Sequence, residues 1–364
     1  MACSGDPLRS STRLAYMKLE LKEVPMRIVG GLDVHRAQIT FDYVDLATGD
    51  QERGVIRPAT RTEFRAFLEH FGNKEGAFAL EGTTGWRFVV EELRRAGMEP
   101  HLAEPAETSF QRGPKRRAKT DRADARLLRD LLLMGRLPES WIPTDHIAEL
   151  RTTVRLRKAL IDERTAWLAR IRAQLFHHGL PIAPDLMTYV GRQWLDEAEL
   201  PAAARQVLDA GCRMVDRIDD EISEIDRELA TIARRLPGCE VLQREWGVGH
   251  VLSVTILAEL GDTRRFSSSR QAVRFAGLDV TVRASDTKRA RGHLSRQGSP
   301  LLRWALYQAA GGAWRTRSPD HAYYLETKKR LGATQARLSV ARRMLRRMHH
   351  QLVQAGETVF ADAA

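Results

Sequence analysis

Hydrophobic and polar positions predict an alternating α/β part up to about residue 142. Short apolar runs bounded by turn residues indicate buried strands, and apolar residues at three- and four-residue spacing indicate amphipathic helices. The expected strands lie at 27–32, 38–46, 51–57, 76–83 and 98–105, and the expected helices at 61–71, 85–96 and 121–134. A hairpin-led sheet followed by alternating helices and strands is typical of an α/β layer with a mixed sheet.

From residue 143 the pattern becomes helical. Residues 145–176 form one long predicted helix whose apolar stripe includes Leu150, Val154 and Leu168, and a second stripe runs from Leu208 to Leu236. Such stripes are typical of a coiled coil or a helical hairpin. The spacing leaves open whether these helices pair within one chain or between protomers.

The last part of the chain combines apolar helices with a polar block. Gly247 and Gly249 separate two apolar helical runs, which resembles a helix-hairpin-helix whose glycine turn lets backbone N–H groups approach a DNA phosphate. A plain helix turn would look similar. Residues 264–299 are polar, basic and punctuated by glycine, and this block ends in a predicted helix at 300–310.

These patterns predict five segments. They are a disordered lead at 1–25, an α/β domain at 26–142, a helical coiled-coil region at 143–236, a mainly α domain at 237–353 and a tail at 354–364. The lead has no apolar signal core, and no run in the chain approaches the ~18 apolar residues that a membrane span needs. The three cysteines are far apart and fit neither a zinc pattern nor a disulfide framework, which favours a reducing cytoplasm.

The basic charge of the chain indicates a polyanionic partner. The chain carries 58 Lys and Arg against 47 Asp and Glu, a net charge of +11, and its basic residues gather at 113–119, 288–296 and 341–350. Each cluster could be a solvated face, and a GC-rich genome also enriches arginine, but three clusters together favour contact with phosphates. The residues expected to bind nucleic acid are Lys115, Arg116, Arg117, Lys119, Lys288, Arg291 and Arg296.

Four carboxylates stand at positions where they could converge. Asp33 and Glu81 end two predicted strands, while Asp121 and Asp124 are three apart at a helix start and so face the same way. Taken singly, Asp33 is an ordinary turn residue and Asp121 an ordinary partner of the helix dipole. Together, such acids are what is needed to hold two Mg²⁺ ions roughly 4 Å apart, which can activate a nucleophile at a phosphodiester.

The order of motifs resembles a known family. GLD at 31–33, ALEGT at 79–83 and KTDRADA at 119–125 are followed by the helical spacer, GVGHVLSVTILAELGD from 247, and RGHLSRQGSPLLRWAL from 291. This order resembles the DEDD-type insertion-sequence transposases, in which an RNase H/RuvC-like domain precedes a serine-bearing transposase domain. The resemblance implies that Asp33, Glu81, Asp121 and Asp124 bind metal. It also implies that Ser285, in RASDTK, is a nucleophile, whereas Ser295 is structural.

The resemblance also implies a reaction and partners. Members of this family move a DNA element by cutting and rejoining strands, guided by a structured bridge RNA whose loops pair with donor and target DNA. Recognition of sequence would then be delegated to base pairing. The serine would form a phosphoserine link while metals polarise the scissile phosphate. The expected assembly is a homodimer or tetramer, in the bacterial cytoplasm at the nucleoid.

Two other functions are compatible with the residues. A metal-dependent junction-resolving nuclease would use the four acids without the serine. A catalytically idle relative would bind RNA or DNA through the basic clusters alone, although retention of all four acids argues against it.

Overall fold

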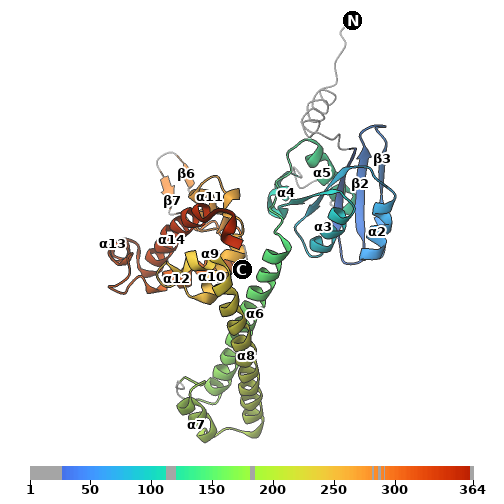
Figure 1. The fold of residues 1–364 in the computed structure, drawn as a ribbon. Helices are drawn as coiled ribbons and strands as arrows, with labels where there is room; N and C mark the ends of the chain where they lie inside the picture. The colour runs from blue at the N-terminus through green and yellow to red at the C-terminus, as the bar shows by residue number, and fades with distance from the viewer. Residues whose placement is uncertain are drawn as a thin grey trace. The chain divides into compact units, whose positions relative to one another are not determined.

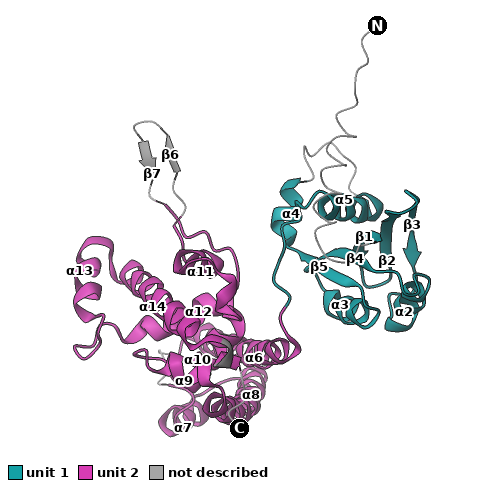
Figure 2. Ribbon diagram, turned by 45° about the horizontal axis from the view of Figure 1, so that its top comes forward, with its two compact units in different colours: residues 1–142 teal, residues 143–364 magenta. Residues whose placement is uncertain are grey.

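The computed structural model describes residues 27–111, 120–180, 185–280 and 292–360, and the backbone alone of strands at 283–285 and 288–290. The expected lead at 1–25 lies outside the described residues. The chain divides into two compact units, residues 1–142 and 143–364 (Figure 2). Each unit is built around its own apolar core.

The first unit is a five-stranded mixed sheet in the order β3-β2-β1-β4-β5 (Figure 1). The strands are β1 (Ile28–Val34), β2 (Ile39–Asp45), β3 (Gln51–Ile56), β4 (Gly76–Glu81) and β5 (Glu99–Ala103). β1 pairs antiparallel with β2 and parallel with β4, and β4 pairs parallel with β5. The central strand β1 therefore joins the hairpin half of the sheet to its parallel half.

Helices cover both faces of this sheet, and the two faces carry side chains of different size. α2 (Arg61–Glu69) and α3 (Trp86–Arg95) pack on a face filled with large side chains, among them Phe64, Phe78 and Leu80. α5 (Asp121–Leu133) packs on the other face against small side chains such as Ala77 and Ala79. α4 (Pro105–Gln111) follows β5. Successive strand residues point to opposite faces, so this division follows from the sequence of each strand.

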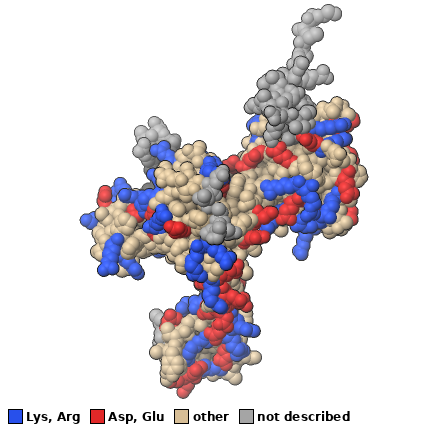
Figure 3. All heavy atoms as spheres, in the orientation of Figure 1, with Lys and Arg blue, Asp and Glu red and all other residues tan. Residues whose placement is uncertain are grey.

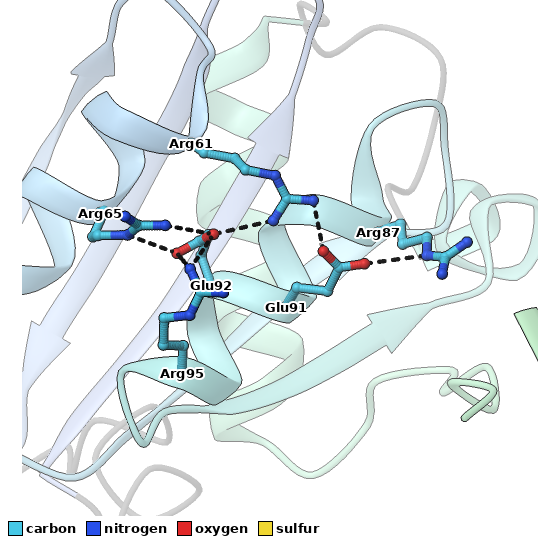
Figure 4. A network of polar contacts seen from close by, with 6 residues as sticks. All are labelled: Arg61, Arg65, Arg87, Glu91, Glu92 and Arg95. Atoms are coloured by element: carbon cyan, nitrogen blue, oxygen red, sulfur yellow. Dashed lines mark hydrogen bonds and ion pairs between the residues drawn. The ribbon is translucent and has the colours of Figure 1, made fainter. Parts of the chain in front are cut away.

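A buried glutamate fastens α2 to α3. Only 1% of the Glu92 side chain is exposed, and its carboxylate accepts hydrogen bonds from Arg61, Arg65 and Arg95 (Figure 4). The pKa of Glu92 is lowered to about 2, mainly by the hydrogen bond from Arg65 and with burial opposing. The same arginine, Arg61, also reaches Glu91 at 2.6 Å. The pair of helices is therefore held by charge as well as by its apolar face.

The second unit begins with two long helices that run antiparallel. α6 (Asp145–His177) and α8 (Ala202–Arg235) are connected through α7 (Tyr189–Glu197) (Figure 1). Arg157 Nη2 donates to Asp226 at 3.0 Å, and Arg164 Nη2 donates to Asp219 at 3.1 Å. The two arginines that interrupt the apolar stripe of the first helix thus form ion pairs across the seam.

The remaining helices share one apolar core with the first turns of α6 and the last turns of α8. They are α9 (Pro237–Gln243), α10 (His250–Leu260), η1 (Thr263–Arg265), α11 (Ser269–Phe275), α12 (Pro300–Ala309), η2 (Ala310–Gly312), α13 (His321–Leu331), α14 (Ala333–Ala355) and η3 (Gly356–Phe360). Leu150 and Leu229 belong to the same apolar cluster as Leu257, Leu306 and Leu345. α10 is buried along most of its length by neighbouring helices, and its one buried carboxylate, Glu259, is paired with Arg155.

The predicted mixed sheet followed by a mostly helical remainder is confirmed. The polar block at 264–299, for which the sequence predicted no elements, contains α11 and the paired strands β6 (Arg283–Ser285) and β7 (Lys288–Ala290). These elements are too short to produce a clear hydrophobic period. Among the described residues, no helix has the length and apolar character to cross a bilayer.

Replacing Glu92 by Gln should remove the charge that attracts three guanidinium groups. A carboxyl whose pKa is lowered on folding contributes stability above its unfolded pKa of about 4.3, and this contribution is lost as pH falls toward the folded value. We expect Glu92→Gln to destabilise the protein at pH 7 and to flatten the dependence of stability on pH between about 2 and 5. Urea unfolding of both proteins across this range measures the effect, and parallel pH profiles would contradict it.

Candidate metal and nucleic-acid site

The first two acidic residues lie at the carboxyl ends of neighbouring parallel strands. Leu32 of β1 is in register with Leu80 of β4, so Asp33 and Glu81 come next on strands about 4.8 Å apart. Leu32 and Leu80, which precede them, face away from α5, and successive side chains of a strand point to opposite faces of the sheet. Asp33 and Glu81 therefore point to the same face of the sheet, the one that α5 covers.

A glycine lets α5 approach this face closely. A Cβ atom at Gly31 would lie 2.0 Å from the carbonyl oxygen of Ala125 and 2.6 Å from the backbone nitrogen of Arg129, so no side chain fits there. Gly31 and Asp33 are two residues apart on the same face of β1. The close contact of backbones therefore brings the start of α5 next to Asp33.

The start of α5 supplies the other two acids. The Thr120 hydroxyl caps the helix by accepting a hydrogen bond from the backbone of Ala123 at 3.2 Å, and Asp121 and Asp124 occupy the first turn. Carboxylates are favoured in that turn by the helix dipole. Burial raises the pKa of Asp33, the nearby His35 opposes this rise, and Asp121 and Asp124 both add to it. These three acids therefore share one electrostatic environment.

His35 also belongs to this site, although the sequence analysis did not include it. Its Nε2 lies 3.2 Å from Asp33 Oδ2 and 3.7 Å from Asp121 Oδ1. Ligand atoms of Asp33, His35 and Asp121 all lie within 4.8 Å of one another; among the described residues, Glu81 and Asp124 are outside this tight group. The signal in the sequence was a histidine two residues after the strand-end aspartate.

Gln38 orients one of these carboxylates. Gln38 Nε2 donates to Asp121 Oδ2 at 2.9 Å, while Arg57 Nε donates to Gln38 Oε1 at 2.8 Å. Because arginine only donates, it fixes the amide so that the Gln38 NH₂ group faces Asp121. The contact depends on the pairing of β2 with β3, which sets Ile39 opposite Ile56, and no local sequence signal marks it.

This donor set fits a divalent cation. Carboxylate oxygens are ligands that Mg²⁺ and Mn²⁺ prefer, and a neighbouring imidazole suits other first-row transition metals. Burial raises the pKa of Asp33 and the two acids of α5 add to the rise, so a bound cation would favour the ionised carboxylate. Asp33, His35 and Asp121 therefore form a candidate metal site, in which Gln38 would orient one of the ligands.

The serine-bearing segment is described only through its backbone. Ser285 is in register with Lys288 across the β6–β7 pair, and the side chains of both lie outside the described residues. The described residues also leave out Lys115, Arg116, Arg117, Lys119 and Arg291, backbone included. Arg296 is described: it has a left-handed backbone (φ 55°), and its N–H donates to Gly277 at 3.3 Å.

Hydrogen bonds hold the base of the β6–β7 hairpin together. The Ser295 backbone N–H donates to the Asp279 carbonyl at 3.0 Å, its hydroxyl donates to the Asp279 carboxylate, and Val280 bridges to Leu294. Arg303 Nη1 donates to the carbonyls of Gln297 and Gly298 at 3.0 and 3.1 Å. In this position the Ser295 hydroxyl holds the two sides of the hairpin together.

Comparisons with known proteins cover both units. A family model of the DEDD IS110 type, described as Transposase, matches residues 30–178, and a model described as Transposase IS116/IS110/IS902 family matches residues 239–325. The transposase for insertion sequence element IS1111A of Coxiella burnetii is 25% identical over 310 residues, 84% of each chain. A protein of insertion element IS116 of Streptomyces clavuligerus is 27% identical over 63% of this chain and 70% of its own.

Replacing Asp33 by Asn should stabilise the metal-free protein. The folded pKa of Asp33 lies above its unfolded value of about 3.9, so ionisation lowers stability as pH rises through that window. At pH 7 in EDTA, we expect Asp33→Asn to melt above the wild type. A cation at ten times its Kd should raise the Tm of the wild type by about 2–4 °C and leave the variant unchanged.

Differential scanning fluorimetry with EDTA, Mg²⁺ or Mn²⁺ measures both effects. Asp50→Asn, which alters an exposed acid in the β2–β3 turn, is the matched control and should behave as wild type. An equal metal-induced rise in the Tm of Asp33→Asn would contradict the assignment of Asp33 as a metal ligand.

Replacing Gln38 by Leu should weaken metal binding without removing a ligand. Loss of a group that orients a metal ligand typically costs 10–100-fold in affinity. We expect the Kd for Mn²⁺ to rise by about 10-fold or more. Isothermal titration calorimetry measures this, with Gln51→Leu on β3 as the control. An unchanged Kd would mean that the Gln38–Asp121 hydrogen bond has no part in the site.

Proposed function

This chain belongs to the DEDD transposases of the IS116/IS110/IS902 family, and from that premise we propose that it moves its insertion sequence with two Mg²⁺ ions and a serine nucleophile. It is a DNA-cleaving and strand-transferring enzyme, and its DEDD domain uses divalent metal. The proposal concerns how this chemistry is distributed over its residues. The observation that carries it is the convergence of Asp33, His35 and Asp121 beside the closely packed α5.

The acids have the role of metal ligands in this proposal. Asp33 and Asp121 lie close enough to share a cation, Asp124 stands one turn further along α5, and Glu81 ends the adjoining strand. Bound cations would polarise the scissile phosphate and neutralise charge that develops on its oxygens. His35 lies between two of the acids and Gln38 holds one of them in orientation.

Ser285 is the proposed nucleophile. Its hydroxyl oxygen forms a bond to phosphorus while the bond from phosphorus to the leaving deoxyribose oxygen breaks, and the serine proton passes to the departing oxygen. Attack by the hydroxyl of an incoming strand then restores a DNA phosphodiester and releases the serine. One phosphodiester is exchanged for another, so no external energy source is needed. An unassisted serine is a weak nucleophile, which is why the metal-binding acids are required.

The proposed partners are donor and target DNA and a structured bridge RNA. Support comes from the net charge of +11 and from basic clusters at 113–119, 288–296 and 341–350. The turn at Gly247 and Gly249, between α9 and α10, is a further proposed phosphate contact. The α6–α8 hairpin is the element proposed to join protomers into a dimer or tetramer.

Recombination between two plasmids, with the flanking RNA supplied, tests the proposed chemistry. We expect Asp121→Ala and Ser285→Ala each to lower recombination by on the order of 10³-fold or more. Only Ser285→Ala should also abolish the covalent protein–DNA adduct while leaving metal binding intact. Ser223→Ala, on the exposed side of α8, is the control.

The alternative functions predict different results. A junction-resolving nuclease would keep cutting DNA when Ser285 is alanine. A catalytically idle relative would bind RNA without any cleavage in Mg²⁺. Either outcome would overturn serine chemistry.

A further inference from the structure

An exposed tryptophan stands in the turn that connects η2 to α13. The Trp314 side chain is 61% exposed, more than any other large apolar side chain of described residues 237–360. Its sequence neighbours Arg315, Thr316 and Arg317 are also exposed. Among the described residues, neither arginine forms an ion pair. A single exposed aromatic side chain is common on a protein surface, but this one stands beside two cations.

This exposure belongs to a fixed loop. Successive turns are closed by hydrogen bonds from Arg315 N to Gly312 O at 3.1 Å and from Ser318 N to Arg315 O at 2.9 Å. Beyond them, the buried Asp320 is bound by Arg347 at 3.0 and 2.7 Å. A segment anchored in this way keeps the indole in place in the absence of a ligand.

The other end of the loop is equally constrained. A Cβ atom on Gly312 would lie 3.0 Å from Trp246 Nε1, so the backbone packs directly against that second indole. The Arg315 guanidinium lies 5.7 Å from the centre of the Trp314 ring. The loop therefore presents one flat aromatic ring with a positive charge over one of its faces.

The chemistry of this loop fits a nucleotide better than an apolar protein surface. The exposed residues next to Trp314 in the sequence are two arginines and a threonine, which supply charge and hydrogen-bond donors beside the ring. Bases stack on aromatic rings whatever their identity, and arginine binds the phosphate that accompanies each base. A base in a duplex has both faces covered by its neighbours, so the ligand must be unpaired.

We propose that residues 314–317 form a binding site for an unpaired nucleotide, with the base stacked on Trp314 and its phosphate bound by Arg315 and Arg317. The site rests on the proposed function only in that the protein binds nucleic acid. It is independent of the metal site and of Ser285. RNA and DNA offer the same base and phosphate, so the experiment distinguishes them.

The test measures binding of the full chain to fluorescein-labelled 12-nucleotide strands of one mixed sequence, as RNA and as DNA, and to the blunt DNA duplex. Measurements are made in EDTA, so that failure of the proposed cleavage chemistry does not affect them. We expect Trp314→Ala to raise the Kd for single strands by roughly 10-fold and Trp314→Phe to change it by less than about 2-fold. Replacing both arginines by glutamine should lower the salt slope by roughly 0.7 per charge.

Controls and a second measurement make the outcome decisive. Tyr189→Ala removes an aromatic ring that is 82% exposed elsewhere in the same unit, and it should leave the Kd unchanged. Strands carrying 4-thiouridine or 4-thiothymidine should crosslink to the peptide that contains Trp314. A loss confined to RNA or to DNA identifies the ligand. No loss, an equal loss on the duplex, or an equal effect of Tyr189→Ala would overturn the proposal.

Discussion

The contact of α5 with β1 at Gly31 is the constraint on which the acidic site depends. Backbone meets backbone there, with Ala125 O and Arg129 N where a Cβ would otherwise stand. Any larger residue would lift the first turn of α5 away from the sheet, and Asp121 with it. The small residues Ala77 and Ala79 on β4 extend the same close approach. The opposite face of the sheet is filled with aromatic rings, so the largest side chains and the acidic site lie on opposite faces of one sheet.

Bringing carboxylates together in this way costs stability in the absence of a cation. Burial is the main cause of the raised pKa of Asp33, His35 opposes the rise, and both acids of α5 add to it. Several features offset part of the cost: the helix dipole and the Thr120 cap favour negative charge at the start of α5, and Gln38 donates to Asp121. Strain of this kind is typical of a functional site, since a sheet that needed only stability would place apolar residues there.

The sequence predicted the parts of this site that depend on local order and missed those that depend on pairing. Strand ends and a helix start are visible in hydrophobic periods, and these gave Asp33, Glu81, Asp121 and Asp124 as candidates. Gln38 and Arg57 come together only through the register of β2 with β3, which no short window contains. His35 was recoverable in principle from its spacing to Asp33. The exposure of Trp314 could not be predicted, because a tryptophan next to an apolar helix is more often part of its core.

In the second unit, ion pairs help to set the register of α6 against α8. Two ion pairs, Arg157 with Asp226 and Arg164 with Asp219, connect α6 to α8 in the observed alignment of their apolar stripes. Such partly exposed pairs contribute about 0.2–1 kcal/mol each, so their effect is on alignment more than on stability. Leu150 and Leu229, near the ends of these helices, belong to the core that also holds α10, α12 and α14. A slip of one helical turn would misplace this core, and with it α12, whose Arg303 fastens the base of the serine-bearing hairpin.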